Sequence, residues 1–337
     1  MKRHARSLWS VLVVMLVIAL LLAACGPGEV LPTMTPMPSA TATPRSIPLP
    51  EVLTAIPLAS EDRPLTILML PQGARRAAAT ANEDLATLIQ ELTGLTVEVQ
   101  LVNTYGEIVV QLCGSTPVVG WLDGPALIVA EAQGCADPAL LVERGGATGY
   151  QVEMVMNTRH VGNEPDPEDV AQMADETLCR VVGDAAADWQ IVELLLRTGG
   201  VNPLTDLDEI IDVEDYDALV TAVYENECAG GVLPAGTYPR ELGAELRAIE
   251  DLQEDVALIT TSPEIPYDSL VYPQTVPLNV RIPLTDIFMQ ISVDEENAAT
   301  LSSILEQDRL QRVDGADFAE FRAFMAATGL DFAALGD

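Results

Sequence analysis

From residue 63 onward, short apolar runs alternate with stretches that repeat apolar residues every three or four positions. The runs predict strands at 65–70, 96–102 and 117–122, and the longer period predicts helices at 78–93, 105–112 and from Gly124. A second series predicts strands at 150–157, 178–183, 229–233 and 256–260, and helices opening at 165–169 and spanning 188–197, 216–226 and 239–252. Three final helices are predicted at 280–291, 295–307 and 316–328. Successive strand–helix units imply parallel sheets with helices on their faces, and the two series imply two lobes.

The first residues show a different pattern. A basic start with Lys2, Arg3 and Arg6 precedes an unbroken apolar run at 11–24. A membrane-spanning helix needs about 20 such residues, so this run predicts the core of a signal peptide at 1–24. The run ends in LAAC at 22–25, which resembles the lipobox that lipoprotein signal peptidase cleaves. We therefore expect lipid on Cys25 and an extracytoplasmic chain anchored to the cell membrane by that lipid; the alternative is an ordinary signal peptide.

Residues 25–61 are rich in Pro, Thr, Ala and Ser, as in PTMTP at 32–36. Such a composition cannot bury a core, so we expect a lipidated cysteine followed by an extended tether. The formal net charge of -34 argues against a nucleic-acid partner, because phosphate contacts need clustered Lys and Arg. Lys2, the only lysine, leaves with the signal peptide.

Five cysteines are present. If lipid takes Cys25, four remain, and an exported chain lies where disulfides persist. Four cysteines allow three pairings. A zinc site is the alternative, but no CxxC occurs and His160 is the one histidine after the signal peptide. We therefore expect neither a metal nor a cofactor.

From Arg63 to the C-terminus the chain resembles the phosphate, phosphite and phosphonate substrate-binding proteins of ABC transporters. The segments that carry the resemblance, in order, are RPLTI at 63–67, NTY at 103–105, VGWLDGPA at 119–126, VGD at 182–184, GGVNP at 199–203, YDALV at 216–220, AGGV at 229–232 and IPYD at 265–268. Together, their order and spacing identify the family.

The resemblance implies an α/β, two-lobed periplasmic-binding-protein fold of type 2, with a ligand cleft between lobes that close by a hinge. The first lobe is expected at 62–150 plus 278–337 and the second at 151–277. In that topology Cys179 and Cys228 start neighbouring strands, which favours the disulfides Cys113–Cys135 and Cys179–Cys228.

In open α/β sheets, ligands bind beyond the carboxyl ends of strands, where helix N-termini point. On this basis and from the family match, we expect ligand contacts from ten residues: Gln72, Gly73, Tyr105, Asp123, Gly124, Asp188, Trp189, Asp217, Tyr267 and Asp268. Several of these side chains have ordinary structural alternatives, such as capping a helix or packing in the core.

One segment departs from the family. The family binds the phosphoryl group with a hydroxyl-rich turn that opens the second-lobe helix, whereas this chain has GDAAADW at 183–189. No hydroxyl is present, and Asp188 is placed to cap the helix itself. With the acidic charge, this departure predicts that the cleft prefers a neutral, zwitterionic or cationic small molecule over phosphate.

Two functions fit these features. The first is an extracytoplasmic solute-binding lipoprotein that captures a small molecule and, as a monomer, delivers it to an ABC transporter permease. The alternative is a transport-inactive sensory or scaffolding lipoprotein that keeps the fold. We do not expect an enzyme, because no G-x-S-x-G or metal motif occurs and His160 lies in a polar stretch.

Overall fold

A computed structural model describes residues 57–337, apart from 163, 183–188, 314–315 and 335–337. The predicted signal peptide, Cys25 and nearly all of the predicted tether therefore lie outside the described residues. Within the described part of the chain, no helix is long and apolar enough to cross a membrane.

The first large sheet has six strands in the order β13-β4-β12-β3-β1-β2. Strands β1, β2 and β3 are parallel, whereas β12 runs antiparallel to both β3 and β4, and β13 runs antiparallel to β4. The strands are β1 (Leu65–Met69), β2 (Val97–Leu101), β3 (Val118–Leu122), β4 (Asp137–Glu143), β12 (Ser269–Tyr272) and β13 (Arg309–Arg312).

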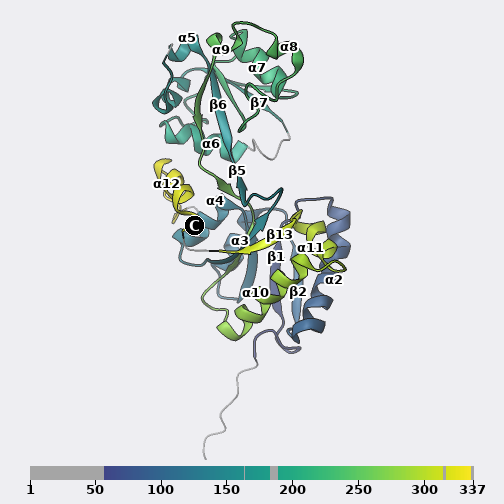
Figure 1. Ribbon diagram of the computed structural model, residues 1–337. Coiled ribbons are helices and arrows are strands. Elements are labelled where there is room, and N and C mark those ends of the chain that lie inside the picture. Colours follow the sequence, from purple (N-terminus) through teal and green to yellow (C-terminus); the bar gives the residue numbers. More distant parts are fainter. Residues whose placement is uncertain (1–56, 163, 183–188, 314–315, 335–337) are drawn as a thin grey trace, which may run out of the picture. The chain divides into compact units, whose positions relative to one another are not determined.

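Helices cover both faces of this sheet (Figure 1). One face packs against α2 (Arg75–Thr93), α10 (Leu278–Val293) and α11 (Ala298–Leu305), and the other against α3 (Tyr105–Leu112) and α4 (Gly124–Ala132). The sequence of β1 is almost wholly apolar because both of its faces are buried. Ile67 and Met69 belong to the core of the first face, whereas Leu68 belongs to the core of the second.

The second large sheet has five strands in the order β10-β6-β9-β7-β8. Its strands are β6 (Val152–Asn157), β7 (Thr177–Val181), β8 (Glu209–Val213), β9 (Gly230–Pro234) and β10 (Val256–Thr261). Strands β7, β8 and β9 are parallel, and β6 and β10 are antiparallel to their neighbours. The helices near this sheet are α5 (Thr158–Val161), the 3-10 helix η1 (Pro167–Met173), α6 (Trp189–Thr198), α7 (Tyr216–Tyr224), α8 (Ala244–Arg247) and α9 (Leu252–Asp255).

Two short strands, β5 (Gly149–Tyr150) and β11 (Ile265–Pro266), form an antiparallel pair where the chain passes between the two large sheets. We call the segments that contain β5 and β11 the crossing segments. A Cβ atom on Gly149 would collide with the backbone of Ile265, so their close pairing requires glycine there. The last helix, α12 (Ala319–Ala327), packs against both α4 and α6 (Figure 1).

The strand directions correct one expectation. Both sheets are mixed and not purely parallel, because β12 and β13 in the first sheet and β6 and β10 in the second run antiparallel to strands beside them. Strands β4, β12 and β13 were not predicted. The lobe boundaries stay a prediction. If each lobe is defined by its large sheet, however, the chain returns to the first lobe before β12, because β12 belongs to the first sheet. The predicted return was at residue 277.

The helix predicted at 239–252 is also wrong. The structure has only the short α8 there, and Gly243 is held before it by donating its backbone N–H to the Asp217 carboxylate, 2.9 Å from Oδ1. That tertiary contact fixes the chain outside a helix. Pro283, in contrast, does not interrupt α10. The helix continues through it because Leu284, Ile287 and Phe288 are buried in the core on the first face of the six-stranded sheet.

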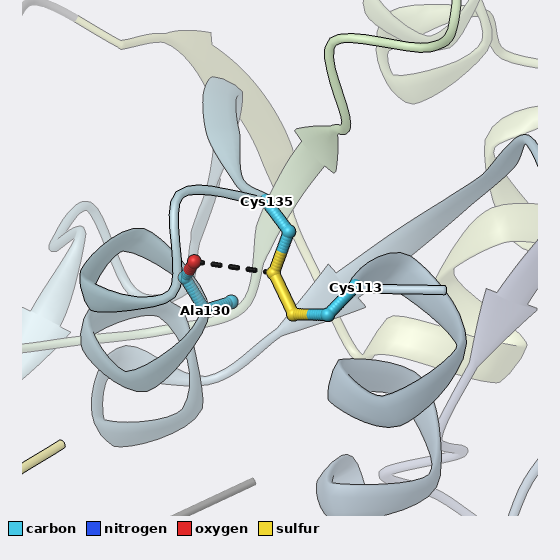
Figure 2. The surroundings of a disulfide bond; sticks show 3 residues. All are labelled: Cys113, Ala130 and Cys135. Carbon is cyan, nitrogen blue, oxygen red and sulfur yellow. Dashed lines mark hydrogen bonds between the residues drawn. A yellow bond between two sulfur atoms is a disulfide. The ribbon is translucent and has the colours of Figure 1, made fainter. Parts of the chain in front are cut away.

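The structure joins Cys113 to Cys135 and Cys179 to Cys228, the two pairs chosen from the sequence, with Cα–Cα distances of 5.0 and 5.6 Å. Figure 2 shows the first pair, which connects the end of α3 to the turn after α4. The Cys135 sulfur lies 3.3 Å from the Ala130 carbonyl oxygen. A disulfide sulfur has no proton to donate, so this is a packing contact.

Candidate functional site

The candidate site is a cavity of about 280 Å³ lined by both lobes and by the crossing segments. The first lobe contributes residues that follow β1, β3 and β4 and the first residue of α3, and the second contributes the start of α6. The lining residues are Gln72, Tyr105, Asp123, Pro125, Arg144, Tyr150, Gln190, Ile191, Ile265, Pro266, Tyr267 and Asp268. A cavity of this size and position suits a small molecule.

A hydrogen-bonded network forms one wall of the cavity. Nε2 of Gln72 donates to Oη of Tyr105 at 2.6 Å, and the Tyr105 hydroxyl donates in turn to Oδ1 of Asp268. Burial raises the pKa of Tyr105, and the nearby Asp268 and Asp123 carboxylates raise it further, so the hydroxyl keeps its proton. The network fixes the tyrosine as a donor to the carboxylate.

Arg144, the residue directly after β4, completes the network. Its Nη2 lies 3.1 Å from Oδ2 of Asp268 and 2.8 Å from the carbonyl oxygen of Leu305. The Asp268 side chain is only 4% exposed. Burial raises the pKa of its carboxyl, while the Tyr105 hydrogen bond and the Arg144 charge lower it. The guanidinium charge is thus matched by a carboxylate of the chain itself.

Two aromatic rings of the crossing segments line the cavity. Tyr150 and Tyr267 stack with ring centroids 5.6 Å apart, and the Arg144 guanidinium lies 4.6 Å from the Tyr267 ring centroid. With Tyr105, three tyrosines face a cavity that also contains two carboxylates. Aromatic faces carry negative potential, so this lining favours positive or neutral groups.

Asp123 sits where β3 turns into α4. Its Oδ1 accepts the backbone N–H of Ala126 at 2.9 Å, so the carboxylate caps the helix, and Pro125 occupies the first turn, where its missing N–H is tolerated. The backbone at Gly124 packs so closely that an added Cβ would lie 2.9 Å from Pro266 and 3.0 Å from Phe321. Glycine is therefore required at this turn.

A second carboxylate lies beside the start of α2. A Cβ atom on Gly73 would lie 2.9 Å from Oε1 of Glu306, so that carboxylate covers the backbone just before the helix. The N–H groups at a helix start ordinarily attract anions. In this lobe, acidic side chains of the chain lie at the starts of both α2 and α4.

The structure places the ten predicted ligand residues differently. Five line the cavity: Gln72, Tyr105, Asp123, Tyr267 and Asp268. The other described ones do not, because Gly73 and Gly124 are covered as above, Asp217 binds Gly243, and the Trp189 ring lies 5.0 Å from the Arg180 guanidinium. Asp188 lies outside the described residues. Ligand contact by these residues remains a prediction.

The sequence analysis missed Arg144, Tyr150 and Gln190. Arg144 follows β4, a strand that the sequence pattern did not predict, and its partner Asp268 is far away in the chain. Gln190 follows Trp189 at the start of α6, and the helix spacing alone does not show which of the two residues faces the cavity. Among the described residues, no cluster of His, Cys, Asp and Glu could hold a metal ion.

Comparison with known proteins supports the fold. Residues 67–318 match the family described as the periplasmic substrate-binding protein of phosphonate ABC transporters. No curated protein matches the chain. Among solved structures, XAC2383 from Xanthomonas citri bound to ATP matches with 14% identity over 79% of this chain and 96% of that chain, at a TM-score of 0.52. This likeness shows the fold alone.

Two further structures are similar at lower scores. A binding protein component of an ABC phosphonate transporter from Pseudomonas aeruginosa shares 16% identity over 79% of this chain and 86% of that one, with a TM-score of 0.47. PhnD1 from Prochlorococcus marinus in complex with methylphosphonate shares 11% sequence identity over 79% of this chain and 98% of that one, also with a TM-score of 0.47. The family match and the structure at a TM-score of 0.52 confirm the architecture expected from the sequence: α/β, two-lobed, of type 2, with a cleft between the lobes.

Proposed function

The chain belongs to the family of periplasmic substrate-binding proteins of phosphonate ABC transporters, and we propose that it is a lipid-anchored receptor that closes on a small molecule and delivers it to a permease. Proteins of this family bind small molecules outside the cytoplasm for an ABC transporter and are not enzymes. The observation that carries the proposal is the cavity, because residues of both lobes and of both crossing segments line it.

Hinge closure is the first part of the proposal. The crossing segments contain the β5–β11 pair and the stacked rings of Tyr150 and Tyr267. Gln190 and Ile191 approach the cavity from the second lobe, whereas Gln72 and Asp123 approach from the first. A ligand that contacts both groups stabilises the closed arrangement by its differential affinity for it.

The lipid anchor is the second part. The motif LAAC at 22–25 and the Pro- and Thr-rich segment after it support acylation of Cys25 followed by a tether. Two or more acyl chains hold a protein firmly at a membrane, since each buried CH₂ contributes about 0.8 kcal/mol. We propose that the receptor works as a monomer at that surface.

The ligand's charge is the third part: a neutral, zwitterionic or cationic molecule is favoured over phosphate. The one cation that lines the cavity among the described residues, Arg144, is paired with Asp268. Asp123 caps α4 and so occupies the position where an oxyanion binds a helix N-terminus, and the Glu306 carboxylate lies close to Gly73, just before α2. With both carboxyls ionised, the described lining carries a formal charge of about −1, and an unmet dianion in a closed cleft is costly.

Isothermal titration calorimetry on the full chain in lipid nanodiscs tests this proposal, with empty nanodiscs as reference. Phosphate and methylphosphonate are compared at moderate salt with tetramethylammonium and with glycine betaine. We expect binding of the cation or the zwitterion, and no heat from the phosphorus anions below millimolar concentration. Micromolar or tighter binding of phosphate or methylphosphonate would contradict the proposal.

A matched pair of variants places the binding in the cavity. Asp123→Asn keeps a side-chain oxygen that can cap α4 but removes the charge, so we expect weaker cation binding with little loss of stability. Asp215→Asn makes the same change at the cap of α7, where Asp215 accepts the N–H of Ala218 at 2.8 Å, outside the cavity lining. Equal cation affinity of the two variants would argue against a site at Asp123.

A further inference from the structure

A second cavity of about 590 Å³ adjoins the first. The two share three lining residues, Tyr105, Asp123 and Gln190. The second cavity runs along α3 and α4 of the first lobe. The combined space exceeds what phosphate or methylphosphonate would fill.

The two cavities differ in chemistry. The first contains the Arg144–Asp268 pair and three tyrosines. The second is lined mainly by aliphatic side chains, and Asp123 is the one charged residue among its described lining. The aliphatic members are Leu70, Val109, Val110, Ala126 and Val129. The carboxylate of Asp123 thus stands at the junction of a polar space and an apolar one.

We propose that the ligand is an organic ammonium ion with a short aliphatic substituent. This inference rests on the proposed function and names the substrate class of the same cleft. The ammonium group lies at the junction, attracted by the Asp123 carboxylate and the Tyr105 ring. A carboxylate accepts several hydrogen bonds, so the cap on α4 does not by itself exclude a cation from Asp123. The substituent extends along Val109 and Val129 of the second cavity.

The apolar wall gives the proposal a measurable consequence, because buried methylene groups strengthen binding. Each contributes about fourfold in affinity, the equivalent of about 0.8 kcal/mol. Butyltrimethylammonium has three methylenes more than tetramethylammonium. Since the second cavity is open to solvent, burial is partial, and we expect a gain of about tenfold.

The test is calorimetry on the full chain in lipid nanodiscs with tetramethylammonium, butyltrimethylammonium and butanesulfonate, using empty nanodiscs as reference. We expect the butyl cation to bind about tenfold more tightly than the methyl one and the sulfonate to give no binding. Equal affinity of the two cations, binding of the sulfonate as tight as that of the butyl cation, or no cation binding would each overturn the inference. In the first case the charge preference of the proposed function still stands, whereas micromolar phosphate binding removes that preference itself.

Variants at Gly106 locate the substituent. Gly106 lines the second cavity in the first turn of α3, and a Cβ there would meet only Oγ1 of Thr104, at 3.8 Å. Gly106→Leu is therefore expected to fold normally while its side chain fills part of the second cavity. We expect it to lower the ratio of butyltrimethylammonium affinity to tetramethylammonium affinity from about tenfold to about one, whereas Gly106→Ala, the control, keeps that ratio. A full butyl preference in a normally folded Gly106→Leu protein would refute the placement.

A second matched pair of variants, at Val110 and Val293, tests the exposed edge of the second cavity. Val110 and Val293 are both helical valines, 65% and 66% exposed, but only Val110 lines the cavity. Val110→Asn is expected to weaken butyltrimethylammonium binding about twofold to threefold, less than the fourfold of one fully buried methylene. Val293→Asn is expected to change nothing. An equal effect of the two substitutions would speak against an apolar contact at α3.

Discussion

Replacing Arg144 with methionine is expected to destabilise the protein through Asp268. The guanidinium lies 3.1 Å from a carboxylate whose side chain is 4% exposed, and methionine keeps much of the side-chain volume without the charge. The substitution therefore leaves a buried carboxylate with only the Tyr105 hydroxyl of its two side-chain partners, and the Leu305 carbonyl loses its donor. Water can replace the guanidinium only in part, because the Asp268 side chain is almost fully buried.

Removing one member of a buried ion pair typically costs about 3–5 kcal/mol. Because a quarter of the Arg144 side chain is exposed, water can partly replace it, and we expect about 3 kcal/mol, the low end of that range. Arg312→Met is the control, since Arg312 pairs with Asp286 while both side chains are 58% exposed. Exposed pairs contribute about 0–1 kcal/mol, so the control should change stability little.

The loss should depend on pH. Burial already raises the pKa of Asp268 in the folded protein, and removing the Arg144 charge, which lowers it, raises it further. A carboxyl with a higher pKa in the folded state stabilises that state fully below its unfolded value of about 3.9, and this stability is lost as the pH rises through the folded pKa. The deficit of Arg144→Met is therefore smallest near pH 4 and increases toward pH 7.

Urea unfolding followed by tryptophan fluorescence at pH 4, 5 and 7 measures this deficit, provided that the slope with urea is the same in both proteins. A deficit below about 1 kcal/mol at pH 7, no larger than that of an exposed pair, would refute the reasoning. So would a deficit of about 3 kcal/mol that does not change with pH, because it would not come from a buried carboxylate.

Three further predictions concern the anchor, a disulfide and a turn. Cys25→Ala should abolish incorporation of a fatty-acid analogue in metabolic labelling, and equal label on the variant would disprove the lipobox assignment. Replacing Cys113 and Cys135 together by alanine opens a loop with a sequence separation of 22 and should lower the free energy of unfolding by about 3 kcal/mol. An unchanged free energy of unfolding would show that the disulfide does not form. Gly124→Ala should cost about 1–3 kcal/mol in urea unfolding by overpacking, whereas Gly106→Ala should not destabilise, and equal stability of both would contradict the close packing at Gly124.

The sequence by itself determined many of the local elements and the resemblance to the family. Helix α3 begins at Tyr105 and ends at Leu112 as predicted, because Thr104 caps it and its apolar residues keep one period. The apolar run at 65–70 predicted a strand, and β1 lies there with side chains buried on both faces of its sheet. Short-range sterics, capping and periodicity decide such features, and all of them are readable within a few residues.

Only the tertiary structure decided which side chains meet. Strand β12 enters the first sheet between β3 and β4, and that insertion brings Asp268 to Arg144, which lies 124 positions earlier in the chain. Glu306 reaches Gly73 in the same way. These contacts leave no local pattern because the free energy that forms them comes from packing whole sheets and helices. The charge of the cleft therefore follows from topology, which no stretch of neighbouring residues encodes.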